Sequence, residues 1–448
     1  MADGVLRVRP GRPLVGQLTP PGDKSISHRA VMLASLASGE SRIRGWLDAG
    51  DTRATLEALE AMGVPIAVIR RAAGAADLTV QGVGLRGLHP PARPLHCRRS
   101  GTTMRLLAGL LAGQPFPSLL DGDPQLRRRP MRRVTLPLRQ MGAEVQDEEG
   151  HAPLRIRGGR LQGITYAMPV ASAQVKSALL LAGLYADGPT TVHQPGPSRD
   201  HTERMLAAMG VEVQVAGLTV TLYPPTAPLA PLDLTVPGDF SSAAFPLVAA
   251  LLVPGSRLLL QGVNLNPTRT GLLEVLREMG AEIVERAVRQ EGGEPVADLE
   301  VRPSPLRATT VAGERVVRMI DEFPIFAVAA TQALGETVVR DAAELRVKEV
   351  DRIAVLVREL RKMGAAITER PDGFIVRGPA PLRGAEVDSH GDHRLAMALG
   401  VAGLLAEGET IVRRAEAIGD SYPGFVEAMQ ALGAGMERLG WRDPEGGG

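Results

Sequence analysis

The feature that most restricts the fold of this chain is an internal repeat that occurs six times along its 448 residues. Each copy is a leucine-bearing segment that runs into a Met-Gly or Leu-Gly step and then into an apolar stretch, as in LEALEAMGVPIAV and LPLRQMGAEV. Apolar residues at helical spacing predict an amphipathic helix, and the glycine suits the left-handed position just beyond a helix end. The six glycines are Gly63, Gly142, Gly210, Gly280, Gly364 and Gly433, at spacings of 79, 68, 70, 84 and 69 residues.

A second repeated element stands before each of these helices. It is a strongly apolar helical segment followed by a glycine and a strand-like stretch, as in LLAGLLAGQPFPSLL and FPLVAALLVPGSRLLL. It precedes the Met-Gly helix by 22 to 29 residues, measured from glycine to glycine. One repeating module is therefore a buried apolar helix, a strand, an amphipathic outer helix and a strand, and six of them predict an α/β fold.

The six modules form two groups of three. LTPPGDKSISHRA from Leu18 and LTVPGDFSSAAF from Leu234 align without a gap at an offset of 216 residues, which indicates a duplicated half. The residues before the first copy are expected to complete the second half, so the chain would pass twice between the domains and form a hinge. The predicted domains are residues 21–235 and residues 1–20 with 236–448, with crossings near 20–21 and 235–237.

The duplication also helps to distinguish structural residues, which both copies share, from candidate functional residues, which only one copy has. Pro-Gly-Asp occurs in both halves, so its first interpretation is a turn that enters a helix. Three polar residues of the first copy have apolar counterparts in the second: Lys24 matches Phe240, Ser27 matches Ala243 and Arg29 matches Phe245. Because only one copy carries the cations, we expect Lys24 and Arg29 to bind or catalyse rather than to form a surface ion pair.

The charge, the cysteine content and the hydropathy exclude several classes of protein. Lys+Arg 51 against Asp+Glu 50 gives a net charge of +1, so a nucleic acid is not an expected partner. One cysteine rules out a disulfide framework and fits a reducing compartment, so we expect a cytoplasmic location. The longest apolar stretch, residues 243–255, is too short to span a bilayer, and no secretory signal is evident at the start.

Lysine is scarce in this chain. Only four of the 51 basic residues are lysines: Lys24, Lys176, Lys348 and Lys362. Where arginine is so strongly favoured, a retained lysine indicates a position at which a compact ammonium group is needed and a guanidinium fork does not serve. Lys348 is followed directly by Glu349, and such an adjacent base and acid suit proton transfer.

The polar residues at the starts of the six buried helices suggest an anion site. A helix start offers unpaired N–H groups and the positive end of the helix dipole, which favour phosphate or carboxylate. The segments are KSISHR (24–29), SGTTMR (100–105), SAQVKS (172–177), SSAAF (241–245), DEFP (321–324) and HGDHR (390–394). The alternative is that these Ser, Thr and Asp residues are ordinary helix caps. If the buried helices run parallel within each domain, their starts would converge on an inter-domain cleft that receives a multiply anionic substrate.

The motifs resemble those of a known family. PGDKSISHRA, SGTTMRLL, GDPQLRRRPM, SAQVKSALLLAGL, SRDHTERML, PGDFSSAAF, ELRVKEVDRI and DHRLAM stand in the order found in the 5-enolpyruvylshikimate-3-phosphate synthases, within the enolpyruvyl transferases. The resemblance covers nearly the whole chain. It implies an α/β fold of two similar domains, each of three βαβαββ units around buried parallel helices, that close over the substrates.

The resemblance also implies an activity and a set of site residues. The enzymes of this family transfer the enolpyruvyl group of phosphoenolpyruvate to the 5-hydroxyl of shikimate 3-phosphate, in the shikimate pathway. The implied shikimate 3-phosphate ligands are Lys24, Ser25, Arg29, Ser172, Gln174, Ser198, Asp321 and Lys348. The implied phosphoenolpyruvate ligands are Lys24, Gly101, Arg129, Gln174, Arg352 and Arg394, and the implied catalytic residues are Lys24, Asp321, Lys348 and Glu349. No metal or cofactor is expected, and we expect a monomer.

Two positions depart from the family pattern. Arg98 and Arg99 stand where the family commonly has Gly-Asn, and Asp420 stands where some members have a substrate-binding lysine. Two alternatives stay open at this point. One is the UDP-N-acetylglucosamine enolpyruvyl transferase of cell-wall synthesis, which typically has a loop cysteine and a Lys-Asn pair that this chain lacks. The other is an inactive protein that keeps the duplicated fold.

Overall fold

The computed structural model describes residues 4–441, which divide into two compact units. The first unit contains residues 22–236 and 291–293, and the second contains residues 4–21, 237–290 and 294–441. The assignment of 291–293 to the first unit has no counterpart in the sequence pattern. Within the described residues, no helix has both the length and the apolar character needed to cross a membrane.

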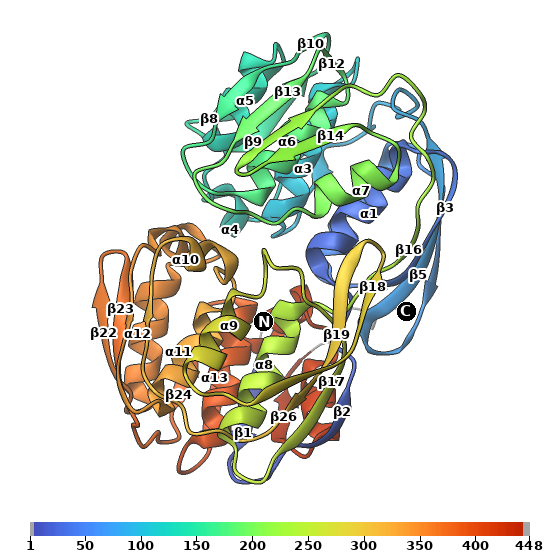
Figure 1. Cartoon of the computed structure of the whole chain (residues 1–448). Coiled ribbons are helices and arrows are strands. Elements are labelled where there is room, and N and C mark those ends of the chain that lie inside the picture. Colours follow the sequence, from blue (N-terminus) through green and yellow to red (C-terminus); the bar gives the residue numbers. More distant parts are fainter. Residues whose placement is uncertain (1–3, 442–448) are drawn as a thin grey trace. The chain divides into compact units, whose positions relative to one another are not determined.

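The first unit carries three four-stranded sheets, ordered β16-β3-β5-β4, β6-β7-β9-β8 and β11-β13-β15-β14 (Figure 1). Its helices are α1 (Lys24–Leu36), α2 (Gly50–Ala61), α3 (Gly101–Ala112), α4 (Pro124–Arg127), α5 (Arg132–Gln140), α6 (Ala173–Gly183) and α7 (His201–Ala208). Its strands are β3 (Ser38–Leu47), β4 (Ile66–Arg70), β5 (Ala75–Val83), β6 (Leu95–His96), β7 (Pro117–Asp121), β8 (Glu144–Glu148), β9 (His151–Arg157), β10 (Leu161–Gln162), β11 (Thr165–Ala167), β12 (Ala186–Asp187), β13 (Thr190–His193), β14 (Val213–Ala216), β15 (Thr219–Leu222) and β16 (Asp233–Thr235).

The second unit repeats this plan with sheets ordered β18-β19-β17-β2, β20-β21-β23-β22 and β24-β25-β1-β26. Its helices are α8 (Phe240–Leu252), α9 (Gly271–Glu278), α10 (Glu314–Arg318), α11 (Phe323–Gln332), α12 (Arg352–Lys362), α13 (His393–Leu405) and α14 (Phe425–Ala431). Its strands are β1 (Val5–Arg9), β2 (Val15–Leu18), β17 (Arg257–Asn264), β18 (Ile283–Glu291), β19 (Glu294–Val301), β20 (Thr310–Val311), β21 (Gly335–Val339), β22 (Ala366–Arg370), β23 (Gly373–Gly378), β24 (Glu386–Asp388), β25 (Thr410–Arg413) and β26 (Gly435–Leu439). The N-terminal strands belong here, because β1 pairs with β25 and β26 and β2 pairs with β17.

The sheet of β6 to β9 illustrates one module. β7 pairs in parallel with β6 and antiparallel with β9, and β8 joins the far side of β9 antiparallel. Along β9 the residues Ala152, Leu154 and Ile156 are buried and alternate with more exposed neighbours. This period of two places one face of the sheet against the helices, while the other face remains open to solvent.

The six Met-Gly or Leu-Gly helices end as the sequence predicts. All six glycines adopt positive φ, between 87° and 103°, a region that side-chain-bearing residues rarely occupy. The chain can therefore turn from each outer helix directly into the following strand or loop.

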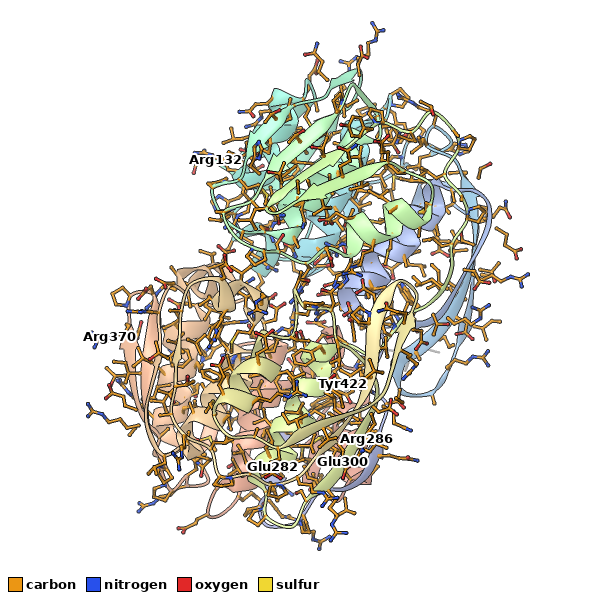
Figure 2. All side chains as sticks on the ribbon, viewed as in Figure 1. Arg132, Glu282, Arg286, Glu300, Arg370 and Tyr422 are labelled. Atoms are coloured by element: carbon orange, nitrogen blue, oxygen red, sulfur yellow. The ribbon has the colours of Figure 1, made fainter. Side chains whose placement is uncertain are left out.

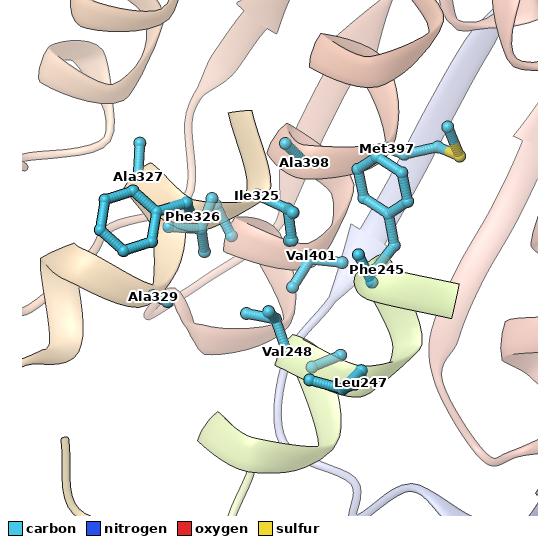
Figure 3. Close-up of a cluster of buried hydrophobic side chains, with 14 of the residues drawn as sticks. Phe245, Leu247, Val248, Ile325, Phe326, Ala327, Ala329, Met397, Ala398 and Val401 are labelled. Atoms are coloured by element: carbon cyan, nitrogen blue, oxygen red, sulfur yellow. The ribbon is translucent and has the colours of Figure 1, made fainter. Parts of the chain in front are cut away.

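The cores lie around the apolar helices. In the second unit, α8, α11 and α13 pack together through side chains such as Phe245, Val248, Phe326 and Val401 (Figure 3). In the first unit, α1, α3 and α6 occupy the corresponding places in the chain and are almost fully buried beyond their first turns. The middle parts of these helices are apolar, and most of their polar residues lie in the first turns.

Many arginines form ion pairs with carboxylates on neighbouring strands. Arg286 of β18, for example, lies 3.1 Å from Glu300 of β19, at an exposed position (Figure 2). Such exposed pairs contribute little stability, about 0–1 kcal/mol each. An arginine in this chain is therefore not by itself evidence of a site.

Candidate active site

The starts of the buried helices in the first unit are capped by side chains. Ile26 N donates to Asp23 Oδ1 (3.0 Å), Thr103 N donates to Ser100 Oγ (3.1 Å) and Val175 N donates to Ser172 Oγ (3.4 Å). The interpretation of these residues as helix caps is therefore correct for all three. A capping hydroxyl still has a proton to donate, so Ser172 can cap its helix and contact a ligand as well.

Lys24 lies at the first position of α1. Its Nζ is 3.0 Å from Oδ2 of Asp51, in the first turn of α2, and the two side chains are 15% and 12% exposed. The carboxylate therefore holds the ammonium group while leaving part of it accessible. Asp51 was not predicted as part of the site.

Arg29 connects three helices of the first unit. The residue is 3% exposed, and its guanidinium donates to Thr202 Oγ1 (2.7 Å), Ser177 Oγ (2.8 Å) and the carbonyl of Ser25 (2.9 Å). Next to it, Arg199 Nη1 donates to Ser25 Oγ at 3.1 Å. Two guanidinium groups thus converge on Ser25, which suits the recognition of a phosphate or a polyol.

A second group gathers at the start of α3. Gly101 leaves room for guanidinium groups, because a Cβ built there would lie 2.9 Å from Nη1 of Arg129 and 3.1 Å from Nη1 of Arg105. Arg105 Nη1 donates to Gln174 Oε1, and Gln174 Nε2 donates to Thr102 Oγ1 at 2.8 Å. The structure therefore brings together Gly101, Arg129 and Gln174, three of the residues predicted to hold phosphoenolpyruvate.

In the second unit, the guanidinium of Arg352 is surrounded by three carboxylates. Its Nε donates to Asp392 Oδ2 (2.8 Å), its Nη2 donates to Glu349 Oε2 (2.6 Å), and its Nη1 lies 3.5 Å from Asp321 Oδ1. Burial alone would lower the pKa of Arg352, but the three carboxylates raise it above its ordinary value. Nη1 is buried and makes no hydrogen bond within the described residues, and its interaction with Asp321 is a 3.5 Å ion pair.

Arg394 and Lys348 lie beside the same carboxylates. Arg394 Nη1 donates to the carbonyl of Asp321 at 3.3 Å, and its Nη2 lies 3.7 Å from Asp321 Oδ2. The Lys348 side chain is partly exposed, but surrounding protein removes enough water to lower its pKa, a change that Asp321, Glu344 and Glu349 oppose. A lysine with a lowered pKa gives up its proton more readily.

A family model described as EPSP synthase (3-phosphoshikimate 1-carboxyvinyltransferase) matches residues 8–429. A 3-phosphoshikimate 1-carboxyvinyltransferase of Citrifermentans bemidjiense is 52% identical over 95% of this chain and 98% of its own length. One from Gloeobacter violaceus is 54% identical over 94% of this chain and 97% of its own length. The chain belongs to this family. The match to a solved EPSP synthase structure from Acinetobacter baumannii covers 97% of this chain and 100% of that chain, with a TM-score of 0.86 and 43% sequence identity.

Family membership confirms the resemblance drawn from the motifs and the fold class drawn from the repeats. It favours the EPSP synthases over the cell-wall enolpyruvyl transferases, the nearest alternative. The likeness extends over all six modules, since the matched solved structure covers 97% of this chain.

Some residues that build the two clusters were missed by sequence reasoning. Asp51, Arg199 and Asp392 each contact a predicted site residue, but none was singled out. Arg199 had a signal, because it directly follows Ser198 in SRDHTERM. Asp51 and Asp392 looked like ordinary residues at helix starts, and only their partners in space distinguish them.

Two of the residues that depart from the family pattern, Arg98 and Arg99, have carboxylate partners. Arg98 Nη2 donates to Glu57 Oε1 at 2.6 Å, and Arg99 Nε lies 3.7 Å from Asp123 Oδ2. Both arginines thereby have acidic neighbours of their own in the first unit. Cys97, just before them, is fully buried, and this burial raises the pKa of its thiol. The side chain therefore packs as a small apolar group.

A surface groove of the first unit does not coincide with either cluster. It has a volume of about 470 Å³ and lies along the sheet of β6 to β9, where its lining includes Arg93, Glu144, Arg155 and Arg157. No predicted site residue lines it. The chemistry of the predicted residues therefore has to be sought at the helix starts, not at this groove.

Proposed function

We propose that this chain transfers the enolpyruvyl group of phosphoenolpyruvate to the 5-hydroxyl of shikimate 3-phosphate and releases phosphate. The family to which the chain belongs is named after this activity. The observation that carries the proposal for this chain is the Arg352 cluster, in which an anion-binding guanidinium lies within 3.5 Å of Asp321 and Glu349, two carboxylates that can carry protons. The reaction needs both kinds of group beside the double bond of phosphoenolpyruvate.

The residues of the first unit are proposed to bind the anionic groups. Shikimate 3-phosphate is held by hydroxyls and cations at the helix starts, and Arg199 joins the predicted set through its bond to Ser25. The set is Lys24, Ser25, Arg29, Ser172, Gln174, Ser198 and Arg199. Gly101, Arg129 and Gln174 receive phosphoenolpyruvate, for which planar guanidinium groups provide bidentate bonds to carboxylate or phosphate.

The residues of the second unit are proposed to handle protons. Asp321 accepts the proton of the attacking hydroxyl, while Glu349 and Lys348 deliver a proton to the methylene carbon. The guanidinium groups of Arg352 and Arg394 balance the negative charge of phosphoenolpyruvate. They stay protonated near neutral pH, so they cannot exchange protons themselves. Asp321 lies near both arginines, so a base and the anion ligands occupy one small region of this unit.

The reaction then proceeds through addition and elimination. Protonation of the methylene carbon gives cationic character at C2, and the 5-hydroxyl adds to that carbon as Asp321 takes its proton. The tetrahedral intermediate loses phosphate when a proton leaves the new methyl group. Fixed cations and helix starts stabilise the developing charges without rearranging, which is an effective form of electrostatic catalysis.

The deciding assay measures phosphate release from phosphoenolpyruvate with shikimate 3-phosphate and, in parallel, with UDP-N-acetylglucosamine. We expect release only with shikimate 3-phosphate. An Asp321→Asn variant should lose most of the turnover, whereas Asp372→Asn, an aspartate of the same unit near the exposed turn at Asp341, should keep it. Release only with the nucleotide sugar would overturn the proposal, and release with neither would favour an inactive scaffold.

We also propose that the protein works as a cytoplasmic monomer on small molecules, with neither nucleic acid nor membrane as partner. The balanced charge and the buried, single cysteine support this. Light scattering coupled to size-exclusion chromatography would measure the mass in solution. A mass of twice 47.4 kDa would contradict the monomer.

A further inference from the structure

Lys176 is a buried lysine near the start of α6. It is 1% exposed, and its Nζ is 2.5 Å from Glu203 Oε1 on α7. Nζ also donates to the carbonyl of Ser198 at 3.2 Å. The ammonium group therefore joins α6 both to α7 and to the loop that precedes α7.

Stability alone is a weak explanation for this ion pair. The desolvation of two buried charges offsets most of their attraction, and apolar residues of similar size often serve as well in such places. The part of α6 beyond Ser177 is apolar in this way, with Leu179 and Leu180 fully buried. The second contact of the ammonium group, to the carbonyl of Ser198, is one that an apolar pair could not make.

That contact fixes a loop that reaches the proposed shikimate 3-phosphate ligands. Ser198 Oγ donates to Gln194 Oε1 at 2.5 Å, so the loop is also closed on itself. The next residue, Arg199, donates to Ser25 Oγ, and Thr202 in the first turn of α7 accepts from Arg29. A shift of the Ser198 carbonyl would therefore displace ligands on both sides of it.

We propose that Lys176 is a positioning residue for shikimate 3-phosphate: its ammonium group holds the Ser198 carbonyl and thereby fixes Ser198 and Arg199. It does not contact the substrate. The inference rests on the proposed function. A lysine suits this place because a single nitrogen serves an acceptor on each side, whereas the planar fork of arginine directs its donors differently.

Three variants separate positioning from stability. Lys176→Met/Glu203→Leu removes both charges and keeps the volume, so its Tm should stay near that of the wild type. Its KM for shikimate 3-phosphate should rise about tenfold, with kcat and the KM for phosphoenolpyruvate changed less than about twofold. Glu203→Gln keeps the donor to Ser198 and should lower the Tm while leaving both KM values near those of the wild type. Lys176→Arg keeps the charge and should also raise the KM for shikimate 3-phosphate.

The outcomes decide between the two roles. A folded double variant with an unchanged KM for shikimate 3-phosphate, or with both KM values raised equally, would overturn the inference. If the double variant does not fold, Lys176→Arg decides, and a normal KM there counts against positioning. If the wild type releases no phosphate, the proposed function fails instead. Calorimetric titration of the wild type and the variants with shikimate 3-phosphate then tests positioning by Kd, and equal Kd values would reject it.

Discussion

The buried contact between Asp392 and Arg352 allows a sharp test of the electrostatics in the second unit. Asp392 is 0% exposed, accepts from Arg352 Nε at 2.8 Å and caps α13 by accepting from Arg394 N at 2.9 Å. The substitution Asp392→Asn keeps the shape and the cap, because asparagine caps helices as well as aspartate does. It removes one negative charge and, with the amide oxygen kept at the cap, replaces the oxygen that accepts from Arg352 Nε by an NH2 donor.

The size of the expected stability loss depends on the carboxylates that remain next to Arg352. Breaking a buried ion pair typically costs about 3–5 kcal/mol, because the surviving charge is left uncompensated. Here Glu349 at 2.6 Å and Asp321 at 3.5 Å still face the guanidinium, so we expect a smaller loss, about 2–3 kcal/mol in the free energy of unfolding. At roughly 2–4 °C per kcal/mol for a unit of this size, the Tm should fall by about 4–12 °C.

Asp351→Asn is a matched control in the same unit. Asp351 also caps a helix, by accepting from Ala354 N at 3.0 Å, and also pairs with an arginine, since Arg346 Nη1 lies 2.7 Å from it. Its side chain is 37% exposed, however, so the loss should be below about 1 kcal/mol. Denaturant unfolding followed by circular dichroism measures both variants. Equal losses would refute the reasoning, because burial is the only large difference between the two sites.

Four further predictions concern the site itself. Gly101→Ala should fold normally but raise the KM for phosphoenolpyruvate, because the new Cβ would lie 2.9 Å from Arg129 Nη1; an unchanged KM in steady-state assays would contradict this. Lys24→Arg keeps the charge and should lose most of the turnover, and near-normal kcat would refute the need for an ammonium group. Glu344→Gln removes a carboxylate that raises the pKa of Lys348, so the alkaline limb of kcat/KM against pH should move to lower pH; no movement would exclude Lys348 as the titrating group. The predicted hinge should let both substrates compact the protein, and an unchanged radius of gyration in X-ray scattering would count against closure.

The repeats predicted most of the fold because they are local features of the sequence. An apolar period and a terminal glycine are properties of neighbouring residues, and Gly63 and Gly433 both adopt positive φ although they lie in different modules. From the place where the first repeat begins, the sequence predicts only that the preceding residues complete the second half, and the pairing of β1 with β25 and β26 was not predicted. Strand partners depend on the tertiary fold and leave little trace in the sequence.

The site was less predictable for the same reason. Motifs identified Lys24 and Arg352, whereas their partners Asp51 and Asp392 lie 27 and 40 residues away and look like routine caps. The capping interpretation of Ser100 was correct, yet Gly101 beside it approaches two guanidinium groups. The start of one helix thus contains both a structural cap and candidate site residues. The sequence alone does not show which residue has which role.

The four lysines show what the scarcity of lysine selects. Lys362 has a side chain that is 45% exposed, and its Nζ lies 2.6 Å from Oε2 of Glu359, whose side chain has no exposure. Lys24 and Lys176 likewise each hold one carboxylate that is 12% exposed or less, and Lys348 lies among acidic groups that raise its pKa. The exposed carboxylates, by contrast, are mostly paired with arginine, as at Glu300. A shielded carboxylate does not by itself require lysine, because Arg352 holds the fully buried Asp392 and Arg269 pairs with the nearly buried Asp239. The scarcity of lysine therefore does not by itself identify a proton-transfer site.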